Sequence, residues 1–508
     1  MNTQSRGTKT MRSIGLRKLA GLALAVTMMG APLIGAAQTA APAAPTLGTS
    51  ATPAPTPNTP TGTAAAAPNT SGAGATAAAP APTAPPVATP PAAPVSTDKV
   101  FVLNSGDTAW MLTSTALVLM MTIPGLALFY GGMVRKKNVI ATVAQSFAMT
   151  CVVTLVWFIA SYSIAFGTNA DKDQNAWWGG LGNLMLKNLA VDKPYTIAGT
   201  AYGIPEYVYM MFQMTFAVIT PALICGAFAE RLKFSALLLF TVLWSIFVYG
   251  PIAHWVWGGG FLGTMGVMDF AGGTVVHINA GVAGLVCALV LGKRKGLGNV
   301  NMAPNNLVYT MIGASLLWVG WFGFNAGSAV AANSLAGVAM VNTQVATAAA
   351  AMAWMAVEWF HRKKPTMLGM ASGAVAGLVA VTPASGWVEP TGALWIGLAA
   401  GMGCYLSAVF LKNMLKYDDS LDAFGVHGVG GFIGAMLTGV FASAAIAKLP
   451  DGHGVLTQLK SCLATIAWTG AMTWVILMVC KFTTGLRVSE EEEEEGLDIV
   501  LHGETIHD

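Results

Sequence analysis

From about residue 107 onward, the sequence alternates between long apolar segments and short polar connections. Each segment is near the roughly 20 residues that an α-helix needs to cross the hydrocarbon core of a bilayer. Only 10% of the side chains are charged, against about 25% in ordinary soluble domains. The sequence therefore predicts an all-α polytopic, multi-pass membrane protein. Eleven transmembrane helices are expected, beginning near residues 108, 139, 206, 235, 272, 307, 343, 367, 390, 423 and 458.

The few charged residues exclude some classes of function. The formal net charge is only +3, and the basic residues form short clusters beside apolar segments instead of a nucleic-acid-binding stripe. We therefore expect the lipid bilayer, and no nucleic acid, as a partner. The cysteines lie inside apolar stretches without metal-ligand or disulfide spacing, and no cofactor or metal is expected. They are Cys151, Cys225, Cys287, Cys404, Cys462 and Cys480.

The first hundred residues differ in composition from the rest. Residues 1–37 combine a basic start, an apolar run and a small-residue end, which is typical of a cleaved signal peptide. An uncleaved amino-terminal anchor is the alternative. Residues 38–97 are almost entirely Ala, Pro, Thr, Gly, Ser and Asn, and are expected to form a disordered tether. A membrane domain over residues 98–485 and a tail over residues 486–508 should follow.

Lysine and arginine residues favour alternate loops, which predicts the orientation of the chain. One set of loops holds fifteen of these residues, and the opposite set holds six. The more basic set is expected to be cytoplasmic. The amino terminus should then lie outside and the carboxy terminus inside, as an odd number of spans requires. The tail, with its glutamate run from Glu490 to Glu495, is therefore expected to be cytoplasmic.

A weak internal repeat relates spans one to five to spans six to ten. Span three contains Thr220-Pro221-Ala222, and span eight contains Thr382-Pro383-Ala384. Span five follows an acid and carries a histidine in a Gly-rich setting, and span ten does the same. Because equivalent spans run in opposite directions, the repeat should be inverted, as in transporters with a site near the midplane. The predicted architecture is an inverted 5+5 repeat plus an eleventh helix.

Of the seven histidines, only His277 and His427 lie well inside predicted spans. At about 1.5 Å per residue, both fall in the middle third of a hydrocarbon core roughly 30 Å thick. One such histidine could simply hydrogen-bond a neighbouring helix. Two at matched repeat positions favour a pathway or a proton relay, because imidazole can both donate and accept a proton near neutral pH.

Acidic residues precede both histidine-bearing spans. Asp269 is expected to cap free backbone amides at the start of span five, and its charge would help to hold a cation nearby. Asp422, with Asp418 and Asp419, is expected to form a cap and a solvated cluster at the cytoplasmic mouth. These acids are therefore assigned structural roles.

Several aromatic residues converge on the outer face once the orientation is fixed. Phe212 and Phe216 lie in span three, Trp257 follows span four, and Phe324 and Ser328 lie in span six. Each aromatic residue alone is typical of packing or of an interfacial belt. Together they could form a desolvated cation site, with ring faces worth about 2 kcal/mol or more and a serine oxygen as acceptor.

Five segments resemble motifs of the ammonium transporter family, which includes the bacterial Amt, fungal Mep and animal Rh proteins. The resemblance extends from about residue 116 to residue 503 and fits the bacterial Amt branch best. The segments are TIPGLALFYGGMVRKKN (122–138), GAFAERLKFSA (226–236), DFAGGTVVHINAGVAGLVCALVLGKR (269–294), GWFGFNAGSA (320–329) and FGVHGVGG (424–431).

The resemblance implies roles for named residues. It implies an outer recruitment site of Trp257, Phe216 and Ser328, a gate of Phe216 and Phe324, and pore histidines His277 and His427. It also places Phe212 and Gln213 at the entrance and Asp269 in support of the recruitment site. Further implications are a homotrimer in the bacterial inner (plasma) membrane and a cytoplasmic PII-type signalling protein that docks on it.

The expected activity is non-enzymatic ammonium transport. Ammonium would be recruited outside, deprotonated and conducted as ammonia past the histidines, with separate proton transfer left open. An ammonium sensor with the same fold and an Rh-like neutral-gas channel are alternatives. The short tail favours transport over sensing, and Trp257 with Ser328 favours cation recruitment over gas conduction. A redox enzyme with histidine-ligated haem or copper would leave the phenyl pair unexplained.

Overall fold

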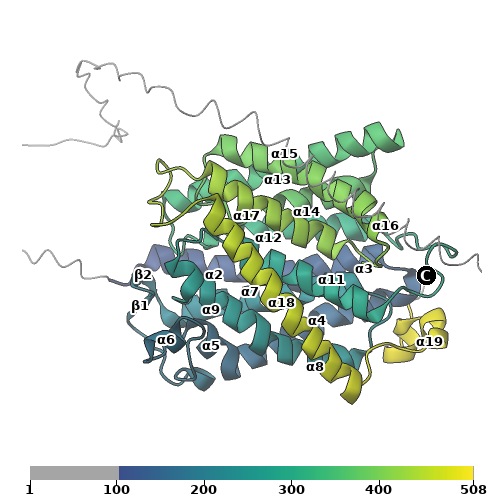
Figure 1. Ribbon diagram of the computed structural model, residues 1–508, viewed down its shortest axis with the longest axis horizontal. Coiled ribbons are helices and arrows are strands. Elements are labelled where there is room, and N and C mark those ends of the chain that lie inside the picture. Colours follow the sequence, from purple (N-terminus) through teal and green to yellow (C-terminus); the bar gives the residue numbers. More distant parts are fainter. Residues whose placement is uncertain (1–101, 507–508) are drawn as a thin grey trace, which may run out of the picture. The chain divides into compact units, whose positions relative to one another are not determined.

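The computed structural model describes residues 102–506, and helices account for most of them (Figure 1). The expected signal peptide and tether lie outside the described residues. Ten helices within residues 102–506 are long and apolar enough to cross a membrane, judged by length and composition. The predicted span near residue 367 corresponds to a shorter apolar helix, Met367–Val381. Its regular part ends just before Pro383, whose ring and missing N–H disfavour continuation.

The first five predicted spans correspond to segments that several short π-helical turns interrupt. They are α2 (Ser105–Met120), η1 (Met121–Leu126) and α3 (Ala127–Met133); α4 (Val139–Val156), η3 (Trp157–Ser161) and α5 (Tyr162–Phe166); α7 (Glu206–Phe228); α8 (Phe234–Trp244), η5 (Ser245–Tyr249) and α9 (Gly250–Val256); and η6 (Gly273–Ile278) and α11 (Asn279–Leu291). The connections contain η2 (Lys136–Asn138), α6 (Lys172–Asn175), η4 (Leu184–Leu186) and α10 (Phe261–Thr264).

The remaining spans follow the same pattern. They are α12 (Leu307–Gly327); α13 (Ser334–Arg362); α14 (Met367–Val381); α15 (Pro390–Leu406), η7 (Ser407–Leu411) and α16 (Lys412–Leu415); η8 (Phe424–Gly428) and α17 (Val429–Phe441); and α18 (Val455–Thr483). The tail contains α19 (Glu490–Glu495) and η9 (Asp498–His502).

The helix contacts of the first five spans recur in the next five. Helix α7 packs against α2, α4 and α11, and α14 packs against α12, α13 and α17. Likewise α4 packs on α8, and α13 packs on α15. The sequence repeat is therefore also a repeat of packing. Span eleven, α18, lies across both histidine-bearing spans, against α11 and α17 (Figure 1).

A short β-hairpin departs from the all-α prediction. Strand β1 (Pro194–Ile197) pairs antiparallel with β2 (Thr200–Pro205). Its two-residue turn, Ala198 and Gly199, has positive φ at both positions, the conformation that matches the twist of a hairpin. Tyr195 and Ile197 are buried on one face of β1. The hairpin is not predicted from the sequence because its strands, of four and six residues, are much shorter than the apolar segments that identify the helices.

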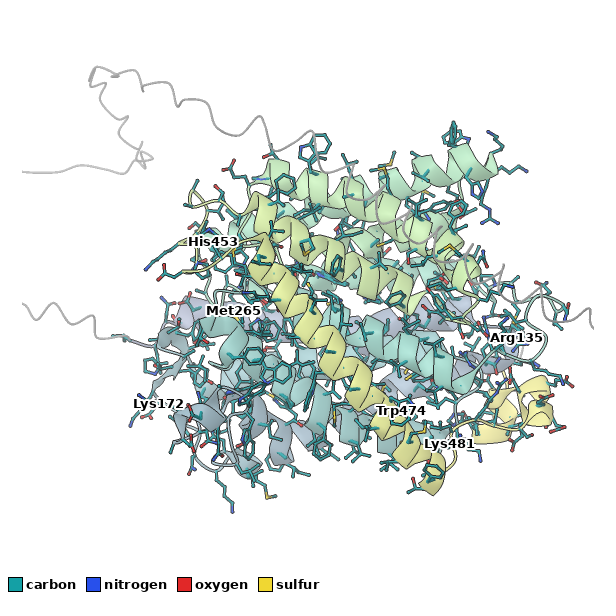
Figure 2. All side chains as sticks on the ribbon, in the orientation of Figure 1. Arg135, Lys172, Met265, His453, Trp474 and Lys481 are labelled. Carbon is teal, nitrogen blue, oxygen red and sulfur yellow. The ribbon has the colours of Figure 1, made fainter. Side chains whose placement is uncertain are left out.

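Charged loops gather at the two ends of the helices. Figure 2 shows Lys172 and His453 at one end and Arg135 and Lys481 at the other. The tail docks at the second end through buried Glu493, whose carboxylate accepts hydrogen bonds from the backbone N–H of Lys295 (2.6 Å) and from the Arg487 guanidinium (2.5 Å). The glutamate run is thus partly structural rather than a uniform solvated stretch.

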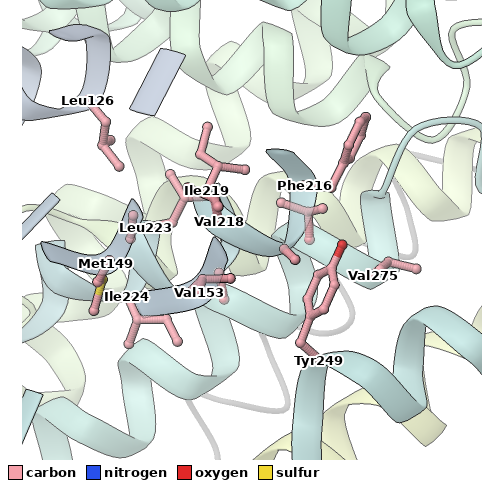
Figure 3. Close-up of a cluster of buried hydrophobic side chains, with 14 of the residues drawn as sticks. Leu126, Met149, Val153, Phe216, Val218, Ile219, Leu223, Ile224, Tyr249 and Val275 are labelled. Carbon is pink, nitrogen blue, oxygen red and sulfur yellow. The ribbon is translucent and has the colours of Figure 1, made fainter. Parts of the chain in front are cut away.

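The apolar core centres on α7, whose residues from Phe212 to Phe228 are all buried. Figure 3 shows part of this core, with Val218, Ile219 and Leu223 of α7 gathered together. A helix that is buried all round is typical of the interior of a bundle. The central position of α7 brings it against η6 and α11, which form the first histidine-bearing span.

Candidate functional site

A column of aromatic rings leads from the end of α9 into the helices. The Trp257 ring lies 5.8 Å from the Phe216 ring, edge to face, and Phe216 lies 4.9 Å from Phe212, between ring centroids. The rings of Phe216 and Phe324 are 4.2 Å apart. Both phenyl rings are buried, and Trp257 is half-buried. The structure thus brings together the aromatic residues expected from the sequence to converge.

The column continues from Phe324 to the first histidine. The Phe324 and His277 ring centroids are 6.0 Å apart, and the Trp321 ring lies nearly parallel to His277 at 5.4 Å. The Trp321 indole N–H donates a hydrogen bond of 2.9 Å to the Thr382 hydroxyl, which itself donates to the carbonyl of Leu378. This bond ties the indole of α12 to the end of α14 and fixes its position beside His277.

His277 and His427 lie side by side in the interior. Their Nδ1 atoms are 3.3 Å apart, and their rings lie within 19° of parallel with centroids 5.4 Å apart. Each histidine lies on a π-helical turn, η6 or η8, that opens its span. Such turns inside helices recur at functional sites because they redirect side chains and free backbone groups. Both side chains are almost wholly buried.

The Nδ1 contact makes the two rings chemically different. When both rings are neutral, one Nδ1 carries the proton and donates it to the lone pair of the other. The donating ring then has a bare Nε2, and the accepting ring has an Nε2–H. Within the described residues, the buried Nε2 of His277 has no hydrogen-bond partner. The pair can therefore offer a small polar molecule both a donor and an acceptor.

Glycines let the two histidine-bearing spans cross closely. Gly281 and Gly431 each lie four residues after a histidine. A Cβ at Gly281 would meet the backbone N of Gly428 at 2.2 Å, and one at Gly431 would meet the Cβ of His277 at 3.0 Å. Small residues allow this approach where helices pack in lipid. The reciprocal positions match the internal repeat.

Asp269 caps the first histidine-bearing span. Its buried carboxylate accepts hydrogen bonds from the backbone N–H groups of Gly272, Gly273 and Thr274 at 2.6–2.8 Å, and from the Thr274 hydroxyl. The carbonyl oxygen of Asp269 accepts a 2.8 Å hydrogen bond from the Trp257 indole. The carboxylate of Asp269 thus caps the start of the helix, while the backbone carbonyl of Asp269 orients the Trp257 indole.

The acids before the second histidine-bearing span correct an expectation. Asp418 and Asp419 are buried, not solvated, and Asp419 rather than Asp422 caps the span, accepting from Ala423 N (3.0 Å) and Phe424 N (2.8 Å). Asp422 has a φ of 59° and pairs with Lys412. Burial, with the nearby Asp422 carboxylate, raises the pKa of Asp419 to about 6.

A buried ion network joins several connections at this end. Arg294 contacts Asp418 at 2.9 Å and Glu230 at 3.1 Å, and Glu230 also contacts Arg135 at 2.9 Å. Burial alone would raise the pKa of Glu230, but the guanidinium groups of Arg294 and Arg135 together hold it below its ordinary range. Burial also acts to raise the pKa of Asp418, and there Arg294 and Arg231 lower it. The sequence reading did not single out this network.

Ser328 and Gln213 are the remaining predicted site residues. The Ser328 hydroxyl donates to the carbonyl of Phe324 at 2.8 Å, which leaves its oxygen lone pairs free to accept. Gln213 is buried on α7, and its side-chain oxygen has no hydrogen-bond partner among the described residues. Within residues 102–506, no group of three or more His, Cys, Asp and Glu side chains is placed to hold a metal ion.

Trp321 and Thr382 are the site residues that the sequence reading missed. Trp321 lies three residues before Phe324, so a helix puts both rings on one face. That spacing could have identified the indole. In the sequence, Thr382 stands out only as part of a repeated Thr-Pro-Ala motif, and its bond to Trp321 depends on how α12 and α14 pack.

The family model described as Ammonium Transporter Family matches residues 109–507. The chain belongs to the ammonium transporter family. It is 51% identical to an ammonium transporter of Aquifex aeolicus over 407 residues, which cover 79% of this chain and 93% of the relative. Together with the ten apolar helices, this membership identifies a multi-pass membrane protein.

Solved structures of two family members are similar in fold. The crystal structure of Saccharomyces cerevisiae Mep2 matches with a TM-score of 0.71 and 34% identity, covering 77% of this chain and 89% of that one. A structure described as a sensor Amt protein also matches with a TM-score of 0.71, at 28% identity, covering 78% of this chain and 98% of that one. The fold therefore occurs in a family member described as a sensor.

Proposed function

We propose that this chain is an ammonium transporter that takes up the cation at Trp257, deprotonates it and conducts ammonia past His277 and His427. The observation that carries the proposal is the unbroken column of rings from Trp257 through Phe216 and Phe324 to His277. Its spacings are 5.8, 4.2 and 6.0 Å, and the second histidine follows at 5.4 Å.

The proposed orientation puts the Trp257 end of the column outside. All eleven segments cross the bilayer in this proposal, as an inverted repeat of five and five plus α18. The basic loops and the tail then lie in the cytoplasm, in keeping with the excess of lysine and arginine there. The amino terminus is outside, and the column runs inward from the recruitment site.

Ammonium capture relies on the ring faces and one hydroxyl. The indole of Trp257 and the phenyl of Phe216 attract a cation through their π electrons, by about 0.5–2 kcal/mol each depending on desolvation. Ser328 contributes an oxygen whose proton is already donated to the carbonyl of Phe324, so its lone pairs are free to accept a hydrogen bond from ammonium. Phe212 and Gln213 border this entrance. Asp269 supports the site indirectly, by holding the indole and the helix start.

Selectivity against potassium follows from chemistry rather than size. The column beyond Phe216 and Phe324 consists of ring carbons and imidazoles, which cannot replace the hydration shell of a metal cation. Ammonium can give up its proton and cross as a neutral molecule. Potassium has no proton to lose and stays behind. The low polarity of the column is therefore what excludes potassium and admits ammonia.

The histidine pair suits a neutral molecule that both donates and accepts hydrogen bonds. Ammonia could accept from the Nε2–H of one ring and donate to the bare Nε2 of the other. The same pair could pass a proton between its Nδ1 atoms, 3.3 Å apart. If the released proton travels separately through the protein, transport carries net charge.

Assembly and regulation follow from family membership and are part of the proposal. We infer a homotrimer in a bacterial inner membrane, with one column in each subunit. A PII-type signalling protein would dock on the cytoplasmic face, where the basic loops and the tail meet. A crosslinking pattern that stops at three subunits would support the assembly.

The first experiment records current from purified protein in liposomes on a solid-supported membrane after an ammonium pulse. The native chain is compared with His277→Ala and His427→Ala, and an equal potassium pulse tests selectivity. His453→Ala is the matched control, because His453 is an exposed histidine on the connection between α17 and α18. We expect current with ammonium only, changed by either pore substitution and unchanged by the control.

Other outcomes separate the alternatives. No current, with internal pH rising faster than in empty liposomes, would indicate conduction of neutral ammonia without a proton. If neither a current nor a faster rise in pH is seen, the result would count against transport and would favour the sensor. The likeness to a sensor Amt protein keeps that function open. Equal currents with ammonium and potassium would contradict the deprotonation step.

A further inference from the structure

A third histidine, His254, is fully buried and has no part in the proposed transport path. It lies on α9, three residues before Trp257. Its Nδ1 lies 2.9 Å from the carbonyl oxygen of Ala165, and its Nε2 lies 2.6 Å from that of Asn175. Both ring nitrogens therefore face backbone carbonyl oxygens at hydrogen-bond distance.

A carbonyl oxygen can only accept a hydrogen bond. A neutral imidazole has one N–H and one lone pair, so it can satisfy only one of the two carbonyls. Its lone pair would point at the second oxygen, and both atoms carry partial negative charge. Only the doubly protonated imidazolium donates through both nitrogens. The geometry around His254 thus fits the charged ring.

The two carbonyls also favour a positive charge. Ala165 lies in the last turn of α5, and Asn175 is the last residue of α6. Carbonyl groups at the end of a helix lack intrahelical partners and carry the negative end of its dipole, where His⁺ is stabilised. Charge-assisted hydrogen bonds of this kind are about twice as strong as neutral ones. Both effects act against the cost of burying the charged ring.

His254 belongs to a set of contacts that fastens residues 165–179 to the end of α9. Next to it, the Trp255 indole donates to the carbonyl of Trp177 at 2.8 Å. Gly258 lies so close that a Cβ there would meet the Ala165 oxygen at 2.0 Å. Trp257 lies between these anchored residues. The backbone that carries the Trp257 indole is therefore held from both sides.

We propose that His254 is a positioning residue, held as an imidazolium whose two N–H bonds fix Trp257 at the mouth of the ring column. The inference rests on the proposed function, because it assigns Trp257 to ammonium recruitment. His254 itself does not touch the substrate. Both N–H groups of the charged ring donate to carbonyl groups at helix ends. His254 therefore acts on recruitment only through the position of Trp257.

Nitrogen NMR tests the charge of the ring directly. Native protein labelled with ¹⁵N in histidine and ¹³C in the carbonyls of alanine and asparagine is reconstituted in lipid near neutral pH. The His254 signals are assigned by dipolar coupling of one ring nitrogen to an alanine carbonyl and of the other to an asparagine carbonyl. We expect two protonated nitrogens. One protonated and one bare nitrogen would overturn the proposal, and no variant has to fold for this result.

Transport kinetics test the positioning role. His254→Leu removes both ring N–H donors, and His453→Leu is the control. We expect KM for ammonium to rise about fivefold or more, with Vmax within about twofold, because recruitment rather than conduction is impaired. An unchanged KM would refute positioning. A native chain that moves no ammonium would instead contradict the proposed function, and the NMR result would stand on its own.

Discussion

Gly281, four residues after His277, lies against the backbone of Gly428, the residue next to His427. A methyl group at Gly281 would overlap the Gly428 nitrogen, which as backbone cannot move aside without shifting the second histidine-bearing span. Gly281→Ala should therefore cost about 1–3 kcal/mol of stability. It should also reduce ammonium uptake by separating the Nδ1 atoms. Thermal unfolding in detergent and uptake into liposomes measure the two effects.

The control for this substitution is Gly337→Ala. Gly337 is exposed on α13, and a Cβ there would meet no atom within 4 Å. Alanine should raise stability slightly, by about 0.5–1 kcal/mol, because it loses less backbone freedom in a helix. If both substitutions had the same effect, the close crossing of the histidine-bearing spans would not be what Gly281 provides.

Thr382→Val should leave the buried Trp321 indole without an acceptor. An unpaired buried donor costs about 1–3 kcal/mol, and the indole should turn away from His277. We expect a lower maximal rate of ammonium uptake in liposomes, with recruitment at Trp257 little changed. Thr347→Val is the matched control, since the Thr347 hydroxyl donates only to the carbonyl of Thr343 on its own helix. Equal losses in both variants would argue against the indole bond.

Arg294→Met should destabilise the protein strongly. It would leave Glu230 and Asp418 buried without their shared partner, and removing one member of a buried ion network costs about 3–5 kcal/mol. Chemical or thermal unfolding of the purified protein measures this cost. Lys293→Met, at the neighbouring exposed position, should change stability by less than about 0.5 kcal/mol. Similar losses at both positions would mean that the network is not the cause.

Acid should weaken the same network. Because the pKa of Glu230 lies below its ordinary value, the folded state favours the carboxylate. The stabilisation is then complete above about pH 4.5, and is lost as the pH falls through the folded-state pKa. Glu230→Gln should flatten this part of the stability profile. Unfolding temperatures of both proteins between about pH 6 and pH 3 test this, and parallel profiles would contradict it.

Glu493→Gln should release the tail from the loops. Glu493 is buried and accepts from Lys295 N and the Arg487 guanidinium, and hydrogen bonds to a charged group are worth about 1.5–3 kcal/mol. Hydrogen exchange over residues 489–500 should become about tenfold faster or more. Glu495→Gln, at an exposed position, should leave exchange unchanged. Protection that survived in the Glu493 variant would mean that other contacts hold the tail.

Some features of the fold and of the candidate site could be predicted because they depend on composition and spacing alone. Apolar segments of membrane-spanning length identify the helices whatever their partners. His277 and His427 occupy matched places in a repeat, so the sequence predicts that both lie near the middle of the membrane. The contact between their rings is seen only in the structure. The convergence of Phe216 and Phe324 likewise required only the positions of two residues along their spans.

Other features depend on contacts that no local pattern encodes. The Trp321 bond to Thr382 and the Arg294 network join residues far apart in sequence. Among the three neighbouring acids, Asp419 caps its span, whereas Asp422 has a positive φ and pairs with Lys412. Sequence spacing suggested an acid there but could not say which one.

The contact between Phe216 and Phe324 has a kinetic consequence. Two buried rings 4.2 Å apart close the proposed path. Each molecule that follows this path therefore has to displace the rings, which must then return. Uptake should then saturate at high ammonium concentration and rise more steeply with temperature than diffusion through water. By these measures the protein would behave as a carrier, with turnover limited by the motion of its own side chains.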